Sequence, residues 1–112
     1  MQTDIQTQLA ENFEINPQLL PAATLSESEQ WQQFRALLIA RIEELASRNM
    51  EHLMWLLYRV DVNEKKLKAE LLKHPQDGFA AVMADAIIER EIQKAATRKQ
   101  FSNEGEDWSF DV

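Results

Sequence analysis

The stretch 79-FAAVMADAIIEREIQKAATRK-99 is the most informative part of the chain, because it predicts a helix with two apolar faces. Residues three and four apart along a helix share one face. One stripe is Phe79, Val82, Met83, Ala86 and Ile87, and the second, roughly opposite, is Ala81, Ala84, Ile88, Ile92 and Ala95. A surface helix needs one buried stripe, so we expect the N-terminal segment, the C-terminal tail or another chain to cover the second.

The rest of the chain predicts an all-α fold. Only two glycines and three prolines occur among 112 residues, and the abundant Leu, Ala, Glu, Lys, Arg and Gln favour helices. We expect four main helices at about 27–48, 50–60, 62–73 and 78–99, and a short N-terminal helix at about 4–13. Their expected N-caps are Ser26, Asn49, Asp61 and Asp77. The prediction is a compact bundle that forms a single domain of residues 1–100.

The helix expected at 50–60 is predicted to be central, because its apolar residues cover more than half of its circumference. They are Met50, Leu53, Met54, Leu56, Leu57, Tyr58 and Val60. Trp55 lies in the polar window between them, beside Arg59. Both are candidate protein-interaction residues, since Trp and Arg are favoured at interface hot spots. Alternatively, the N-terminal residues Ile5, Leu9 and Phe13 cover Trp55, or the methionines and aromatics frame a small-ligand pocket.

The C-terminal segment 101-FSNEGEDWSFDV-112 combines Trp108 and Phe110 with four acidic residues. It is too short and polar to form a core of its own, so we expect an acidic-aromatic tail that is either disordered or docked. Docking would place it in a groove on a partner or back on Ile88 and Ile92.

The stretch 53-LMWLLYRVDVNEKKLKAELLK-73 has the form of a helix-turn-helix. Its second helix would present Lys65, Lys66, Lys68 and Lys73 to phosphates. It offers no arginine for base readout, and its lysines are expected to pair with acids within the helix. The chain also carries a net charge of −7. A DNA-binding regulator is therefore the alternative function, and binding of nucleic acid is not the leading prediction.

The sequence predicts no catalytic, cofactor or metal site. It has no cysteine, and its two histidines belong to no recognisable catalytic or metal-binding motif. No secretory signal or membrane-length apolar run is evident, so we expect a cytoplasmic protein. The leading prediction is a non-enzymatic interaction or accessory protein that forms a homodimer through Ala81, Ala84, Ile88, Ile92 and Ala95 of the last helix.

Two runs, LLYRVDVNEKKLKAEL at 56–71 and ADAIIEREIQKAATRKQF at 84–101, carry a family resemblance. Over about residues 50–101 the chain resembles small, uncharacterised all-helical bacterial proteins. The resemblance implies a bacterial cytoplasmic protein with a similar helical fold. It brings no catalytic or binding residue to this sequence.

Overall fold

The computed structural model describes the backbone of residues 2–111 and the side chains of residues 5–97. The helices are α1 (Gln2–Asn12), α2 (Glu27–Arg48), α3 (Met50–Val60), α4 (Glu64–Lys73) and α5 (Phe79–Asp111), with a short 3-10 helix η1 (Pro17–Leu19) after α1. The backbone described contains no strand. The predicted all-α class is therefore confirmed, and the packing described below is compatible with the predicted bundle.

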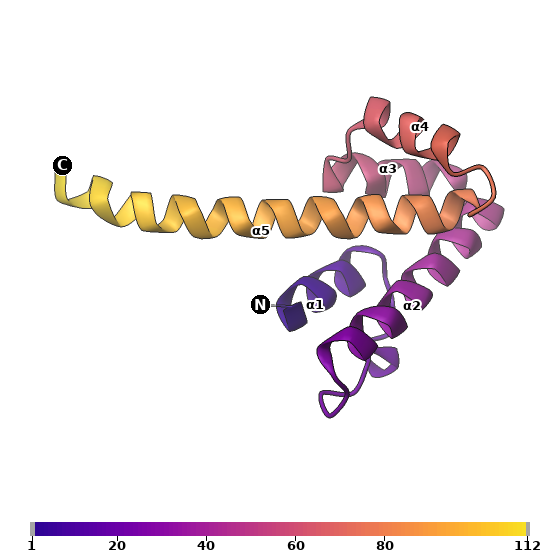
Figure 1. Cartoon of the computed structure of the whole chain (residues 1–112), viewed down its shortest axis with the longest axis horizontal. Helices are drawn as coiled ribbons and strands as arrows, with labels where there is room; N and C mark the ends of the chain where they lie inside the picture. Colours follow the sequence, from indigo (N-terminus) through magenta and orange to yellow (C-terminus); the bar gives the residue numbers. More distant parts are fainter. Residues whose placement is uncertain (1, 112) are drawn as a thin grey trace.

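Helix α5 is the axis of the molecule. Figure 1 shows it running the full length of the structure, with the other helices gathered around its N-terminal part. Its 33 residues account for the longest dimension of 51 Å, because a helix rises about 1.5 Å per residue. The radius of gyration of 15.9 Å exceeds the ~13 Å of a compact chain of this length, because the C-terminal part of α5 projects beyond the other helices.

Helix α5 extends further than predicted. The predicted helix ends at about residue 99, whereas the backbone of α5 continues to Asp111, through the segment predicted as a separate tail. The side chains of Trp108 and Phe110 lie outside the described residues. Docking or disorder of this segment stays a prediction.

The core forms where α1, α2 and α3 meet α5. Its fully buried side chains include Leu9, Phe13, Phe34, Leu38, Ile42, Leu53, Leu56, Val60 and Ile87. Helix α2 makes the most extensive packing against α5, through the row that recurs every four residues at 34, 38 and 42. Helix α4 buries none of its side chains and packs on α5 from outside.

Asn49 joins α2 to α3 without an intervening loop. Its backbone N–H donates to the carbonyl of Leu45 at 2.7 Å, which ends α2. Its side-chain oxygen accepts from the N–H of His52 at 3.1 Å, which caps α3. Ser26 caps α2 in the same way by accepting from the N–H of Glu29 at 3.2 Å. Both predicted caps are confirmed.

Two helices end on an acidic residue in the left-handed conformation. Glu14 after α1 has φ 58° and Asp61 after α3 has φ 66°. The next residue closes the turn in both cases: Ile15 donates to the carbonyl of Ala10, and Val62 donates to a carbonyl in the last turn of α3. Glycine usually occupies this position, so each acid needs compensating contacts from elsewhere in the fold.

The predicted role of Asp61 as the N-cap of the following helix is wrong, because it ends α3 instead. Asn63 caps α4, since its side-chain oxygen accepts from the N–H of Lys66 at 3.1 Å. At the next junction α5 begins at Phe79, and the carboxylate of Asp77 lies 3.4 Å from Nδ1 of His74.

Candidate protein-interaction face

Helix α3 has one buried face and one exposed apolar face. The buried face is Leu53, Leu56, Leu57 and Val60. The opposite face, called the α3 face below, consists of Met50 (50% exposed), Met54 (49%), Trp55 (51%) and Tyr58 (84%). The prediction that α3 is the central helix is therefore wrong, and α5 is central. The wide apolar arc of α3 indicates that this helix is covered on several sides. It does not show whether the same chain or a partner covers the outer side.

Trp55 is held by two neighbours on its own helix. The imidazole of His52 stacks on the indole with ring centroids 5.7 Å apart and planes inclined by 16°. The guanidinium of Arg59 lies over the same indole, 4.9 Å from the centroid, in a cation–π contact. These contacts order the indole while half of its surface stays exposed. An ordered aromatic ring loses little entropy when a partner binds it.

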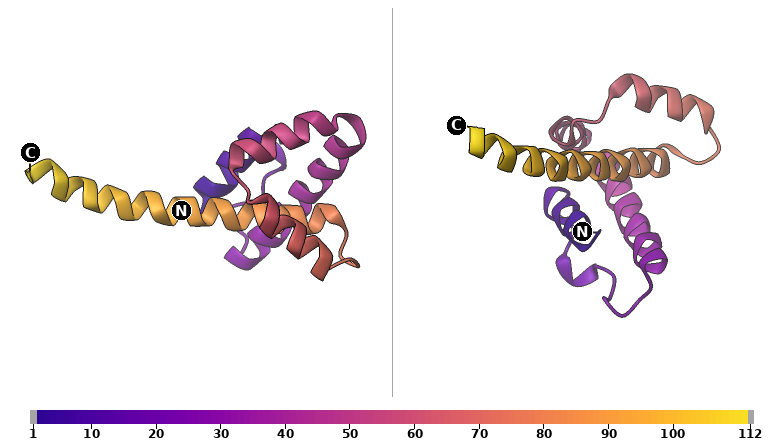
Figure 2. Two further views of the ribbon diagram at one scale, coloured as in Figure 1. Left: turned by 90° about the horizontal axis from the view of Figure 1, so that it is seen from above. Right: turned by 60° about the vertical axis from the view of Figure 1, so that its left-hand side comes forward.

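The α3 face is not covered by the other parts of the chain whose side chains are described. Ile5, Leu9 and Phe13, which were the alternative cover for Trp55, are buried in the core instead. Seen from above, α3 and α4 lie on opposite sides of α5, so α4 leaves the outer side of α3 open (Figure 2, left). The four side chains thus form a surface patch, and none of them lines the groove between α4 and α5 described below.

His52 also connects the α3 face to the end of α1. Its Nε2 lies 2.6 Å from Oε1 of Glu14. The hydrogen bond with His52 lowers the pKa of Glu14, with a smaller contribution from the charge of Arg41. Arg41 also donates from Nε to the carbonyl of Phe13 at 2.8 Å. The imidazole of His52 from α3 therefore holds Glu14 in its left-handed conformation. Arg41 from α2 holds the adjacent carbonyl of Phe13 at the end of α1.

The second stripe of α5, which we predicted as a dimer interface, is only partly exposed. Ala84 is fully buried, and Ile88 and Ala95 pack against the core. Ala81 is half-buried beside a polar groove, and Ile92 alone among the five is classed as exposed, at 45%. Self-association through this stripe stays a prediction, but the surface left for it is small.

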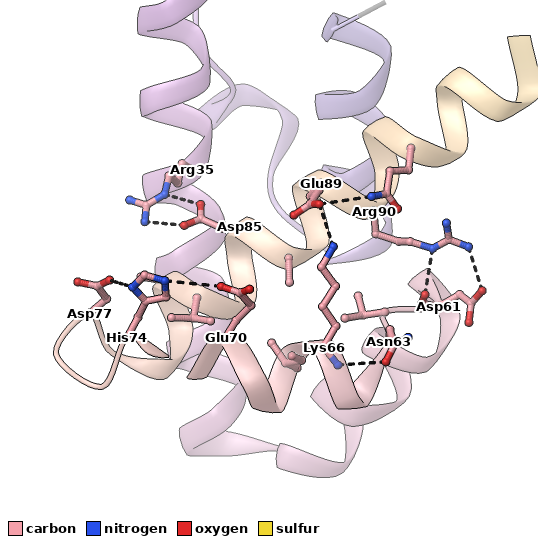
Figure 3. A pocket seen from close by; sticks show the side chains of 16 residues that line it. Arg35, Asp61, Asn63, Lys66, Glu70, His74, Asp77, Asp85, Glu89 and Arg90 are labelled. Atoms are coloured by element: carbon pink, nitrogen blue, oxygen red, sulfur yellow. Dashed lines mark hydrogen bonds and ion pairs between the residues drawn. The ribbon is translucent and has the colours of Figure 1, made fainter. Parts of the chain in front are cut away.

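A polar groove of about 740 Å³ lies between α4 and α5 and reaches Arg35 of α2. Three ion pairs cross it (Figure 3): Arg35–Asp85 at 2.7 Å, Lys66–Glu89 at 3.0 Å and Arg90–Asp61 at 3.1 Å. Hydrogen bonding to Asp85 raises the pKa of Arg35. Since these charges are already paired, the groove is better understood as the place where α2, the end of α3 and α4 are attached to α5 than as a ligand site.

His74 lies at one end of this groove between two carboxylates, 3.6 Å from Glu70 and 3.4 Å from Asp77 (Figure 3). All three side chains are substantially exposed. Among the residues whose side chains are described, no group of three or more acidic, histidine or cysteine residues is arranged to hold a metal ion.

The predicted pairing of the α4 lysines with acids of the same helix is seen for one of the four among the described side chains. Lys66 binds Glu89 of α5, and Lys73 lies 3.8 Å from Glu70. The other two, Lys65 and Lys68, are exposed and have no ion-pair partner among the described side chains. In addition, α4 packs mainly on α5, whereas the two helices of a helix-turn-helix pack on each other.

No protein-family model, curated protein or solved structure matches this chain. The resemblance of residues 50–101 to small helical bacterial proteins therefore stays a prediction. Within the described part of the chain, no helix combines the length and the apolar character needed to span a membrane.

Sequence reasoning missed the exposed positions of Met50, Met54 and Tyr58, although a signal was present. These residues are spaced by four and form one row along α3, separate from the leucines at 53, 56 and 57. A surface helix of a small domain buries one apolar stripe. Since the leucines of α3 supply that stripe, the row at 50, 54 and 58 is expected to lie at the surface.

Proposed function

We propose that the chain is a non-enzymatic, cytoplasmic protein-interaction protein that binds its partner through the α3 face. The observation that supports this is the concentration of Met50, Met54, Trp55 and Tyr58 on the outer side of a helix whose inner side is fully buried. Met, Trp, Tyr and Arg are enriched at protein interfaces, and contiguous exposed apolar patches on soluble domains mark such sites.

Burial of the α3 face would supply part of the free energy of binding. Covering its four half-exposed or exposed side chains contributes several kcal/mol at about 25 cal/mol per Å² of apolar area. The loss of translational and rotational freedom opposes this gain. Because His52 and Arg59 already order the indole of Trp55, less side-chain entropy remains to be lost when the partner binds.

A quantitative pull-down from the native cell tests this function. Wild type is compared with a Trp55→Ser, Tyr58→Ser variant and with a control, Leu72→Ser, whose side chain is 82% exposed on α4. We expect the α3-face variant to lose bound protein by about tenfold, which corresponds to 1.4 kcal/mol, while the control retains it. Equal recovery by all three proteins would contradict the proposal.

A DNA-binding regulator remains the alternative function. Its support is the left-handed turn residue Asp61 between α3 and α4, together with the exposed Lys65 and Lys68, which have no ion-pair partner in the described part of the chain. Two such lysines suit phosphate contact rather than base readout. The packing of α4 on α5 weighs against this alternative.

A further inference from the structure

The α3 face is bordered by opposite charges at equal distances from its centre. Glu51 lies four residues before Trp55 and Arg59 lies four residues after it. Residues four apart form a row along a helix, so Glu51, Trp55 and Arg59 lie on one row beside Met50, Met54 and Tyr58. The two charges are about 12 Å apart along the helix axis.

Neither charge is neutralised by an opposite charge among the described side chains. Glu51 and Arg59 are both exposed, and neither forms an ion pair with another described side chain. Arg59 contacts the indole of Trp55 through its guanidinium face, which leaves its N–H groups at the edge of that plane free to donate. An acceptor from a partner could therefore bind Arg59 without displacing it from Trp55.

This arrangement is complementary to itself. If two α3 helices pack antiparallel about a two-fold axis beside Trp55, Glu51 of each copy lies opposite Arg59 of the other. Two identical ion pairs then border one apolar centre, as the isologous interface of a homodimer requires. A parallel arrangement would place like charges opposite each other, and it would also align the helix dipoles unfavourably.

We propose that the partner of the α3 face is a second copy of this chain, with the two α3 helices antiparallel and Glu51 of each copy paired with Arg59 of the other. This inference rests on the proposed function, since it names the occupant of the same face. It moves the predicted homodimer interface from the last helix to α3.

A charge-reversal series tests the arrangement, with dimer dissociation measured by sedimentation velocity over a range of concentrations. The proteins are wild type, Glu51→Arg, Arg59→Glu, the double variant and an equimolar mixture of the two single variants. Lys68→Glu, on the exposed side of α4, is the control for the change of net charge. Circular dichroism and thermal unfolding check that each variant is folded.

We expect a reversible wild-type dimer. Each single variant places two pairs of like charges across the interface, so its dissociation constant should rise by about tenfold or more. The double variant and the mixture should both return to within about threefold of wild type, because each restores two opposite-charge pairs. The control should dimerise like wild type.

Three outcomes would overturn the inference. A wild type that stays monomeric at high concentration excludes a second copy as the partner. A dimer that is insensitive to both single reversals excludes the Glu51–Arg59 pairing, and a double variant as weak as the single variants does the same. If the pull-down still depends on Trp55 and Tyr58 in any of these cases, the proposed function stands with a different protein as the partner.

Discussion

Arg90 of α5 binds the residue that ends α3, through both its backbone and its side chain. Nε of Arg90 donates to the carbonyl of Asp61 at 3.0 Å, and Nη2 donates to its carboxylate at 3.1 Å. One turn further along α5, Nζ of Lys94 donates to the carbonyl of Val60 at 3.1 Å. Two cations thus satisfy carbonyls that a helix C-terminus leaves unpaired, at the negative end of its dipole.

Replacement of Arg90 should destabilise the fold through this junction. We expect Arg90→Met to lower the free energy of unfolding by about 1 kcal/mol, because the carboxylate of Asp61 is largely exposed and solvent screens the ion pair. Urea unfolding measures the change. Arg48→Met, at an exposed arginine of α2, is the matched control and should change the stability by less than ~0.5 kcal/mol.

A double-mutant cycle with Asp61→Asn separates the side-chain pair from the backbone bond. Asparagine tolerates the left-handed conformation, so this change removes the charge and little else. We expect a coupling energy of about 0.5 kcal/mol between the two sites. Strictly additive effects would show that Arg90 acts only through the carbonyl of Asp61.

The contact between Glu14 and His52 should make stability depend on pH in the acidic range. The folded state lowers the pKa of Glu14 below its ordinary value of 4.5, so the unfolded chain takes up the proton at a higher pH than the folded chain does. The stabilisation is fully present above about pH 4.5 and is lost as the pH falls through the lowered pKa.

Glu14→Gln tests this dependence. The difference in urea midpoint between wild type and the variant should be largest above pH 4.5 and should shrink below it. Glu11→Gln, an exposed acid on the same helix, is the control and should track wild type. If the difference in urea midpoint between wild type and Glu14→Gln is the same above and below pH 4.5, the ionised Glu14 does not contribute to stability as proposed.

Gln6 of α1 is a site where a conservative change should stabilise the protein. It is 4% exposed, and its Nε2 has no hydrogen-bond acceptor among the described residues. A buried unsatisfied donor costs about 1–3 kcal/mol. Gln6→Met keeps the length of the side chain and removes the donor, so we expect a gain of about 1 kcal/mol in thermal or urea unfolding.

The exposed Gln8 provides the comparison for Gln6. Gln8→Met should leave the stability within about 0.5 kcal/mol of wild type. If Gln6→Met is destabilising while Gln8→Met is neutral, the amide of Gln6 has a partner that the described contacts do not include.

DNA binding is expected to be absent or weak. The net charge is −7, and only two lysines of α4 lack an acidic partner among the described side chains, so electrostatic attraction to phosphates is small. Fluorescence anisotropy with a labelled duplex at low and moderate salt measures it. Binding that falls steeply with salt and disappears in a Lys65→Gln, Lys68→Gln variant would favour the regulator over the interaction protein.

Local signals predicted the bounds of α2 and α3 correctly. Ser26 and Asn49 accept from backbone N–H groups three residues later, and this spacing can be read from the sequence alone. The buried row of α2 can also be predicted from local sequence, since Phe34, Leu38 and Ile42 are four residues apart and lie on one helix face. The presence of these helices and the residues at which they begin can therefore be predicted from the sequence.

Long-range contacts decided what the sequence could not show. Asp61 has the composition of an N-cap, but it ends α3 because Arg90, 29 residues away, binds it in the left-handed conformation. Long-range contacts also explain why α5 lies at the centre of the fold, where α3 was predicted. Both helices carry wide apolar arcs, and only the packing of α1, α2 and α4 on α5 determines which arc is covered.

The position of α5 in the chain has a consequence for synthesis. The helix on which α1, α2, α3 and α4 all pack leaves the ribosome after all four of them. Until it emerges, the nascent chain carries the apolar rows of α2 and α3 without the surface that buries them. We expect residues 1–78 alone to stay unfolded and to depend on chaperones, so folding of this chain is completed only after translation of α5.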